Sequence, residues 1–489
     1  MKIGFKIIMA GYKAPYTRRK TNMSQADGNY TVFIKRCEEY DREQLKEIIA
    51  EGMAHLNYRP EGNLFVKPNV VFAYRTEVFG NMAYTATPFV GASLVTLSKS
   101  PGVKRVDLGE NSAVGFPTRL CYKSAGYYDE IKLVRKQAPC PVGIFCMDEE
   151  PRDSVFIGGL VHDNLRVSRK MARADSKVYL PKLKCHCVSS MTGAVKLNIG
   201  ICSDDERSIR HDFMLNEKIV DLLAAGYPDF IVMDAIDVGM GNEAFPTHRK
   251  LGLVIMGTNP MAVDIIGARL LGLGIEDVPY LQAAVNRGYT PTHIDQVTIT
   301  GDLKSVESID EQAKRLMPYD DEFYRWQDIE KELRRLNSPM SFCWGPYRGG
   351  SGEKCLTGCI MGLKMFLGAM EKFAGVEAFK GAKPVTFVIG RYGDRIDARG
   401  EEVFLLGSCA RADIINAKKV THLDKCFTTA GDMNLSIGHK LGMPAVTRDP
   451  VFLASLIAST AKASARKMTS MRYLQDINHF LTKSLIRRV

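Results

Sequence analysis

Short apolar runs and amphipathic helical patterns alternate along the first part of the chain. Asp41 precedes a pattern that predicts a helix to about His55, because apolar residues recur there three or four positions apart. Further helical patterns are found at Glu217–Ala225 and Met261–Leu271. Apolar runs typical of strands occur at 64–72, 93–97, 105–108, 178–183, 230–233 and 251–256. The alternation predicts an α/β fold, with mostly parallel sheets flanked by helices.

The pattern changes twice, which predicts two lobes in a chain of 489 residues, too long for one ordinary core. Residues 1–302 form the first α/β domain, and the highly charged residues 303–340 form a helical connector. A helix near Leu356–Phe373 and glycine-ended strands at Pro384–Gly390 and Glu402–Gly407 predict a smaller, cysteine-containing α/β domain over 341–449. Residues 450–489 look helical, with a stripe suited to docking on the body or on a partner subunit: Leu474, Ile477, Leu481 and Leu485.

The charge balance favours a small anionic partner. The net charge is +11, and no motif of a nucleic-acid-binding protein accompanies it, so nucleic acid is not expected. No run approaches the roughly 20 apolar residues that cross a bilayer, and Ile7–Ala10 is too short for a signal-peptide core. We therefore expect a cytoplasmic protein without a membrane partner, and a homo-oligomer stays open.

The most informative segment is Leu180-Pro-Lys-Leu-Lys-Cys-His-Cys187, at the end of an expected strand. Lys182 and Lys184 would share one face of a strand, where two ammonium groups repel each other unless an anion lies between them. His186 suits an acid, a base or a metal ligand near neutral pH. The alternative is an exposed basic loop with a structural histidine.

Small hydroxyl-bearing residues follow and lead into a helix-like run that carries Lys196 and Asn198. Backbone amides at such a helix start can bind an anion, although simple capping by Ser or Thr explains the same pattern.

Other strand ends supply polar groups that would lie at the same edge of the sheet. The strand at Asp229–Asp237 delivers Asp234 to its end, and a glycine-rich turn with Asn242 follows. Lys67 and Asn69 end one strand; Glu110 ends another, with Arg119 nearby. Taken singly, each of these segments is typical of an ordinary loop.

In this order the motifs resemble domain-of-unknown-function family 362 over roughly residues 60–280. The motifs are Val66-Lys-Pro-Asn69, Gly109-Glu-Asn111, Leu180–His186, Gly193-Ala-Val-Lys196 with Asn198, Asp234–Asp237 through Asn242, and Asn259-Pro-Met-Ala-Val-Asp264. The family looks distantly similar in fold to nickel-dependent lactate racemase, which handles a phosphate-bearing cofactor. Many members also carry a ferredoxin-type domain. This chain lacks the ferredoxin Cys-x-x-Cys-x-x-Cys run and a full set of racemase ligand histidines.

The twelve cysteines are expected to be thiols or metal ligands, not disulfides. Cys355 and Cys359 would share one face of a helix, and Cys409 and Cys426 follow apolar strands. These four could bind one iron–sulfur cluster, with Cys343 as a substitute. Zinc is the competing metal, and buried structural cysteines or a lone reactive thiol are the simpler alternatives. Gly349-Gly-Ser-Gly-Glu-Lys354 could instead bind a phosphate-bearing cofactor.

These observations lead to one functional hypothesis with two alternatives. The leading hypothesis is an iron–sulfur oxidoreductase that acts on a small anionic substrate in a cleft between the lobes, with a possible electron-transfer partner. Its catalytic residues would be Lys184, His186, Asp234 and Glu110. Its anion-binding residues would be Lys67, Asn69, Arg119, Lys182, Lys196, Asn198 and Asn242. The alternatives are a non-redox lyase, racemase or epimerase without a cluster, and a metallocofactor-binding or maturation protein.

Overall fold

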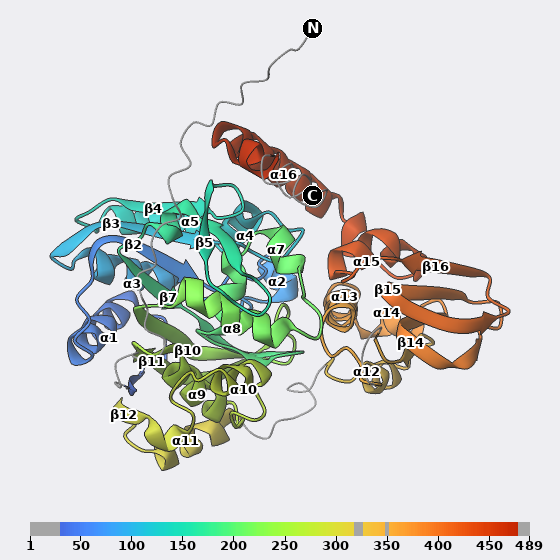
Figure 1. Cartoon of the computed structure of the whole chain (residues 1–489), viewed down its shortest axis with the longest axis horizontal. Helices are drawn as coiled ribbons and strands as arrows, with labels where there is room; N and C mark the ends of the chain where they lie inside the picture. The colour runs from blue at the N-terminus through green and yellow to red at the C-terminus, as the bar shows by residue number, and fades with distance from the viewer. Residues whose placement is uncertain (1–29, 317–325, 348–351, 478–489) are drawn as a thin grey trace, which may run out of the picture.

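The computed structural model describes residues 30–316, 326–347 and 352–477. Within them, a ten-stranded sheet builds the larger lobe and a four-stranded sheet builds the smaller lobe (Figure 1). A separate hairpin of β5 (Arg152–Phe156) and β6 (Asn164–Ser168) lies beside the larger sheet.

The larger sheet is mostly parallel. Its central strands pair in parallel: β10 (Phe230–Met240), β7 (Ser176–Leu180), β2 (Glu61–Pro68), β3 (Gly102–Glu110) and β4 (Val142–Cys146). Strand β11 (Thr247–Gly257) is antiparallel to both β10 and β1 (Thr31–Arg36). A short branch, β8 (Lys182–His186), pairs with β10 and with β9 (Ser190–Thr192). The strand order is β12 (Thr298–Gly301), β1, β11, β10, β7, β2, β3 and β4.

Helices cover both faces of this sheet, because successive strand residues point to opposite sides. Phe65 and Tyr179 pack in the core beneath α8 (Leu215–Gly226), α9 (Pro260–Leu270) and α10 (Pro279–Asn286). Val66 and Val178 pack in the opposite core, beneath α1 (Arg42–His55), α3 (Thr87–Ser98) and α5 (Tyr127–Arg135). The predicted fold class is therefore confirmed.

The local predictions were mostly correct, with one clear error. Helix α1 begins after Asp41, whose carboxylate accepts a hydrogen bond from the Gln44 amide at 2.8 Å. The run at Ser93–Leu97, however, is not a strand but part of α3. Every residue of α3 from Phe89 to Ser98 is buried, so this helix has no polar face to reveal its period.

The smaller lobe is a parallel sheet in the order β13 (Ser341–Trp344), β14 (Val385–Asp397), β15 (Glu402–Ile415) and β16 (Lys419–Leu423). The register between β14 and β15 shifts just after Ile389, next to Gly390. Gly390 and Gly407 have φ angles of 71° and 101°, which favour glycine, so the regular part of each strand ends there.

Helix α13 (Cys359–Ala374) lies where the two lobes meet (Figure 1). Its Ala369 packs in one apolar cluster with Phe72 and Phe245 of the larger lobe. Helix α16 (Pro450–Thr469) then returns to the larger lobe, where Arg466 pairs with Glu150 at 2.7 Å. Leu481 and Leu485 of the predicted C-terminal stripe lie outside the described residues. In the part of the chain that the structure describes, no helix is long and apolar enough to span a membrane.

Candidate functional site

Strand β8 buries Lys182, Lys184 and His186 completely or almost so. The ammonium group of Lys182 donates to Asp234 Oδ2 at 3.0 Å and to the Tyr40 hydroxyl at 2.8 Å. Asp234 also accepts hydrogen bonds from Tyr40 and from the Ala86 amide, both at 2.9 Å. Each of these charges is already neutralised by the other, so the arrangement favours a structural role over the predicted anion binding by Lys182 and the predicted catalytic role of Asp234.

Lys184 is held in a different way. Its amine donates to the carbonyl oxygens of Ala83 and Glu243, at 2.9 and 2.6 Å. Burial lowers the pKa of Lys184 to about 7, so its amine is easily neutral. The two lysines of β8 therefore need no anion between them, contrary to the argument from their spacing.

Three more of the predicted site residues form ion pairs within the chain. Lys67 forms a completely buried ion pair with Glu110, which also accepts the amides of Val70 and Asn111 at 3.0 and 2.9 Å. Arg119 pairs instead with Glu149 at 2.7 Å. These contacts favour structural roles over the predicted catalytic role of Glu110 and the predicted anion-binding roles of Lys67 and Arg119.

Two of the predicted asparagines differ in their hydrogen bonding. Asn198 accepts the Tyr179 hydroxyl at 2.7 Å and donates to the Val195 carbonyl at 3.0 Å, which is a structural role. The side-chain oxygen of Asn69 is buried and has no hydrogen-bond partner among the described residues.

The backbone amides before Lys196 also have a hydrogen-bond acceptor within the chain. The run is a 3₁₀ helix, η1 (Lys196–Ile201), and the amides of Ala194 and Val195 donate to the Asp264 carboxylate at 2.6 and 3.0 Å. Sequence reasoning noted Asp264 only as part of a motif. The carboxylate that ends this motif could have indicated that the chain itself supplies the acceptor for these amides.

A polar group remains at the carboxyl end of β8, which we call the central group: His186, Cys187, Lys196, Glu243 and Lys364. Glu243 accepts the Cys187 amide at 3.2 Å, and its other oxygen lies 3.6 Å from His186 Nε2. Lys364 of α13 donates to the Cys187 carbonyl at 3.2 Å. Sequence reasoning missed Glu243 and Lys364, because neither stands in a recognisable motif.

Lys196 is the accessible cation of the central group. It is half-buried, and within the described ranges its amine has no hydrogen-bond partner. Burial lowers the pKa of Lys196 to about 8, although the charge of Glu243 acts in the opposite direction. Burial also lowers the pKa of His186, to about 3, so this imidazole is neutral. Of the lysines predicted to bind an anion, only Lys196 is free to do so.

The central group has donor atoms for a metal ion, but the hydrogen bonds of His186 oppose metal binding. Donor atoms of His186, Cys187 and Glu243 lie within 4.8 Å of one another, as do those of Cys146, Asp148 and Glu149, so each group could hold an ion. However, His186 Nδ1 accepts the amides of Val188 and Ser189, both at 3.2 Å, which leaves the ring proton on Nε2. A metal ion at Nε2 would have to displace that proton while the lysines nearby repel it.

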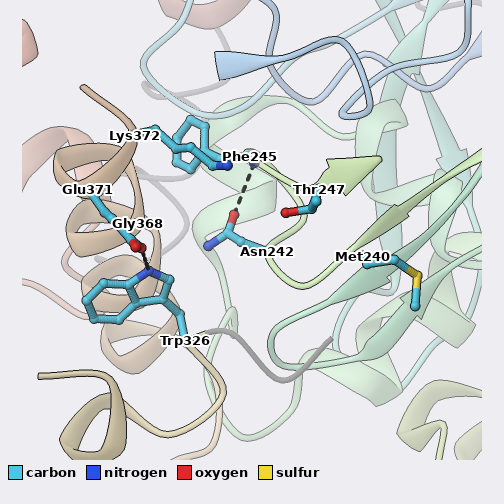
Figure 2. Close-up of a pocket in the computed structure, with 8 residues that line it drawn as sticks. All are labelled: Met240, Asn242, Phe245, Thr247, Trp326, Gly368, Glu371 and Lys372. Carbon is cyan, nitrogen blue, oxygen red and sulfur yellow. Dashed lines mark hydrogen bonds between the residues drawn. The ribbon is translucent and has the colours of Figure 1, made fainter. Parts of the chain in front are cut away.

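The neighbouring Asn242 faces a small cavity between the lobes (Figure 2). Its side-chain oxygen accepts the amides of Ala244 and Phe245 at 2.8 and 3.3 Å. Its buried Nδ2 has no hydrogen-bond partner within residues 30–316, 326–347 and 352–477. Trp326, bonded to Glu371 at 2.8 Å, and Gly368 line the other side. The cavity measures about 10 Å³, which is the space of about one water molecule and not of a substrate.

Four thiols gather at the carboxyl edge of the smaller sheet. We call Cys355, Cys359, Cys409 and Cys426 the thiol group. A Cβ at Gly407 would lie 2.7 Å from Cys359 Sγ and 4.0 Å from Cys409 Sγ, so both thiols face the same point. Burial, together with the nearby Cys409 and Cys426, raises the pKa of Cys359 to about 12. Cys355 and Cys409 likewise raise the pKa of Cys426, after burial and Asp212.

Two details of the predicted cysteine site need correction. Cys355 does not share a helix face with Cys359, because α13 begins only at Cys359 and Gly358 turns the chain with φ 60°. Cys343, the predicted substitute, packs instead with Val388 and Tyr392 in a separate apolar cluster. Part of the Gly349–Lys354 segment, residues 349–351, lies outside the described residues.

Part of the chain is similar to known proteins. The model of the family described as "Domain of unknown function (DUF362)" matches residues 64–269, which confirms the predicted resemblance. The thylakoid-associated protein sll1697 of Synechocystis sp. is 29% identical over 243 residues, which are 48% of this chain and 70% of that protein. The thiol group lies beyond the region that the family model matches.

Among solved structures, the lactate racemase apoprotein from Thermoanaerobacterium thermosaccharolyticum is 13% identical, with a TM-score of 0.33. The match covers 49% of this chain and 56% of that one, so the chain spans about half the length of that protein. The likeness is distant and partial.

Proposed function

We propose that this chain is an oxidoreductase that binds one iron–sulfur cluster at the thiol group and acts on a small anionic substrate at the central group. The observation that carries the proposal is that four thiols are near enough for their charges to interact, at one side of a parallel sheet. They come from the start of α13, the loop before it, β15 and the loop after β16. Ligands commonly bind at the carboxyl edge of α/β sheets.

The donors of the thiol group suit a cluster. Thiolates are the usual ligands of iron–sulfur clusters, and the Thr428 amide donates to Cys359 Sγ at 3.3 Å, a contact that helps to tune such centres. No three of the four sulfur atoms are within 4.8 Å of one another. Sulfur ligands of one tetrahedral zinc stand about 3.8 Å apart. A cluster has ligands that stand farther apart, because each thiolate binds a different iron atom.

Helix α13 joins the two groups. It begins at Cys359, and its Lys364 contacts Cys187 of the central group. A bound cluster would supply single electrons. Lys196 would hold the anionic group of the substrate. Glu243 would stay ionised and balance the charge of Lys196, because a hydrogen bond with Cys187 and the charge of Lys196 lower the pKa of this carboxyl to about 2 despite its burial. Cys426 is exposed, which gives an electron-transfer partner a side from which to approach.

The thiols themselves support a reducing location. All twelve cysteines are free, and such a site persists only where thiols stay reduced, which favours the cytoplasm.

Anaerobic purification with iron, sulfide and visible absorption measurements tests the proposal. We expect a brown protein whose colour is lost in Cys409→Ser but kept in Cys343→Ser, the matched control outside the thiol group. A colourless, metal-free protein would exclude the redox function and leave a lyase, racemase or epimerase. If cluster-loaded wild-type protein converts no anionic substrate, and the Lys196→Met variant behaves in the same way, the chain would instead be a carrier or maturation protein.

A further inference from the structure

Three donor side chains gather at the carboxyl end of β4, where the chain turns after its last residue, Cys146. We call Cys146, Asp148 and Glu149 the turn group. One donor atom of each lies within 4.8 Å of the donor atoms of the other two. Strands β7, β2 and β3 lie between β4 and β10, the strand that pairs with β8. The turn group is therefore distinct from the central group, and the thiol group belongs to the other lobe.

One oxygen of the turn group lacks a partner. Asp148 Oδ1 is completely buried and accepts no hydrogen bond from the described residues, whereas Thr118 forms a hydrogen bond with the same carboxyl. Cys146 and Glu149 are buried as well, and only 5% and 2% of their surfaces are exposed. Asp148 as a whole is partly exposed, which leaves a path of entry for an ion. A buried carboxylate oxygen without a donor is costly, so Oδ1 points to a ligand that neutralises it.

The nearest polar neighbours do not fill the turn group. The guanidinium of Arg119 donates to both oxygens of Glu149, to the first at 2.7 Å. A carboxylate can accept about four hydrogen bonds, so each of these oxygens keeps a lone pair for another partner. The Tyr128 hydroxyl lies 3.9 Å from Cys146 Sγ, a long contact that leaves the sulfur available. Neither neighbour reaches Asp148 Oδ1.

The charges around the turn group suit a divalent cation. Its two carboxylates repel each other, and Asp204 adds a third negative charge beside Asp148. The cations that act on these carboxylates are Arg119 and Lys467. Burial raises the pKa of the Cys146 thiol, and the two carboxylates raise it further, so this sulfur ionises only beside a cation. Three carboxylates and one thiolate against two cations would leave two negative charges, which one divalent ion balances.

We propose that the turn group is a zinc site, with Cys146 Sγ and one oxygen each of Asp148 and Glu149 as ligands. Zinc accepts sulfur as well as carboxylate oxygen, whereas magnesium and calcium take oxygen ligands. Ligand atoms of a tetrahedral zinc stand about 3.3–3.8 Å apart, so small side-chain movements suffice. On binding, the Cys146 thiol releases its proton to solvent and its sulfur bonds to the ion, whose charge stabilises the thiolate. This site does not depend on the proposed cluster.

Cadmium-113 magnetic resonance of the full-length protein, with its thiols kept reduced, tests the zinc site. Cadmium takes the same ligands, and its chemical shift depends on how many of them are sulfur, so a site with one sulfur is distinguished from a four-sulfur site. We expect a one-sulfur resonance that is lost in Cys146→Ser. It should persist in Cys187→Ser, which removes the sulfur of the central group. It should also persist in Cys140→Ser, the matched control, because Cys140 is a partly exposed cysteine of the same lobe outside both groups of clustered donors among the described residues.

Two results would overturn the zinc site. One is wild-type protein without a one-sulfur resonance; the other is a one-sulfur resonance that survives in Cys146→Ser and disappears in Cys187→Ser, which would place the ion at the central group. Should Cys146→Ser fail to fold, Asp148→Asn decides, because Asp148 is partly exposed. Its zinc affinity, measured by equilibrium dialysis, should fall at least about tenfold, the loss that even an outer-shell partner causes. Equal zinc binding by Asp148→Asn and wild-type protein would also reject the site.

Discussion

Lys182 and Asp234 form an ion pair of 3.0 Å in which both side chains are completely inaccessible to solvent. Removing one partner would leave the other charge buried and unpaired. We expect Asp234→Asn to lower the free energy of unfolding by about 3–5 kcal/mol. Urea denaturation measures this change. A double variant, Lys182→Met with Asp234→Leu, should recover most of the loss, and failure to do so would argue against a purely structural pair.

Gly407 leaves space for the thiol group. A Cβ there would meet Cys359 Sγ at 2.7 Å, and its φ of 101° strains any other residue. We expect Gly407→Ala to fold less stably and to retain less than half of the wild-type iron after anaerobic purification. Gly393→Ala is the control, because a Cβ at Gly393 meets nothing within 4 Å. Equal iron in both variants would contradict the placement of the cluster.

Gly200 lies against the buried pair of Lys67 and Glu110. An added Cβ would stand 2.3 Å from Glu110 Oε1 and 2.5 Å from Lys67 Nζ. We expect Gly200→Ala to cost about 3 kcal/mol or more of unfolding free energy, because it breaks a buried ion pair. Gly381→Ala, with no other atom closer than 4.0 Å, should cost far less in the same urea titration.

The neutral amine of Lys184 predicts a dependence of stability on pH. Its pKa is about 7 in the folded chain against an ordinary 10.5, so between these values the unfolded chain binds more protons. The free energy of unfolding should therefore rise with pH in this window, relative to Lys184→Met, by at most about 1.4 kcal/mol per pH unit. Denaturation of both proteins at several pH values measures the difference. Parallel curves would show that Lys184 stays charged.

The periodic parts of the fold were predictable from the sequence, because one-sided burial leaves a pattern. Helix α1 shows it, with Leu45, Ile48, Ile49 and Met53 on its buried side and Asp41 as its cap. Helix α3 does not, since nearly all of it is buried. The location of the candidate site at β8 followed from strand ends, which meet at one edge of a parallel sheet.

The roles of the charged residues were not predictable, because pairing depends on segments far apart in the chain. Lys182 meets Asp234 and Tyr40 only after folding, and Glu110 meets Lys67 across neighbouring strands. Nothing local distinguished Lys196 as the lysine whose amine stays free.

The direction of α13 has an electrostatic consequence. Its peptide dipoles add along sixteen residues and place the equivalent of about half a positive charge at the end where Cys359 stands. Negative charge at the thiols is therefore favoured by the helix start of the smaller lobe, whereas Asp212 of the larger lobe opposes it and raises the pKa of Cys426 after burial. A helix start contributes about 0.3–1 kcal/mol to a charge next to it. Each lobe thus contributes part of the electrostatic field that an added electron at the thiol group would experience.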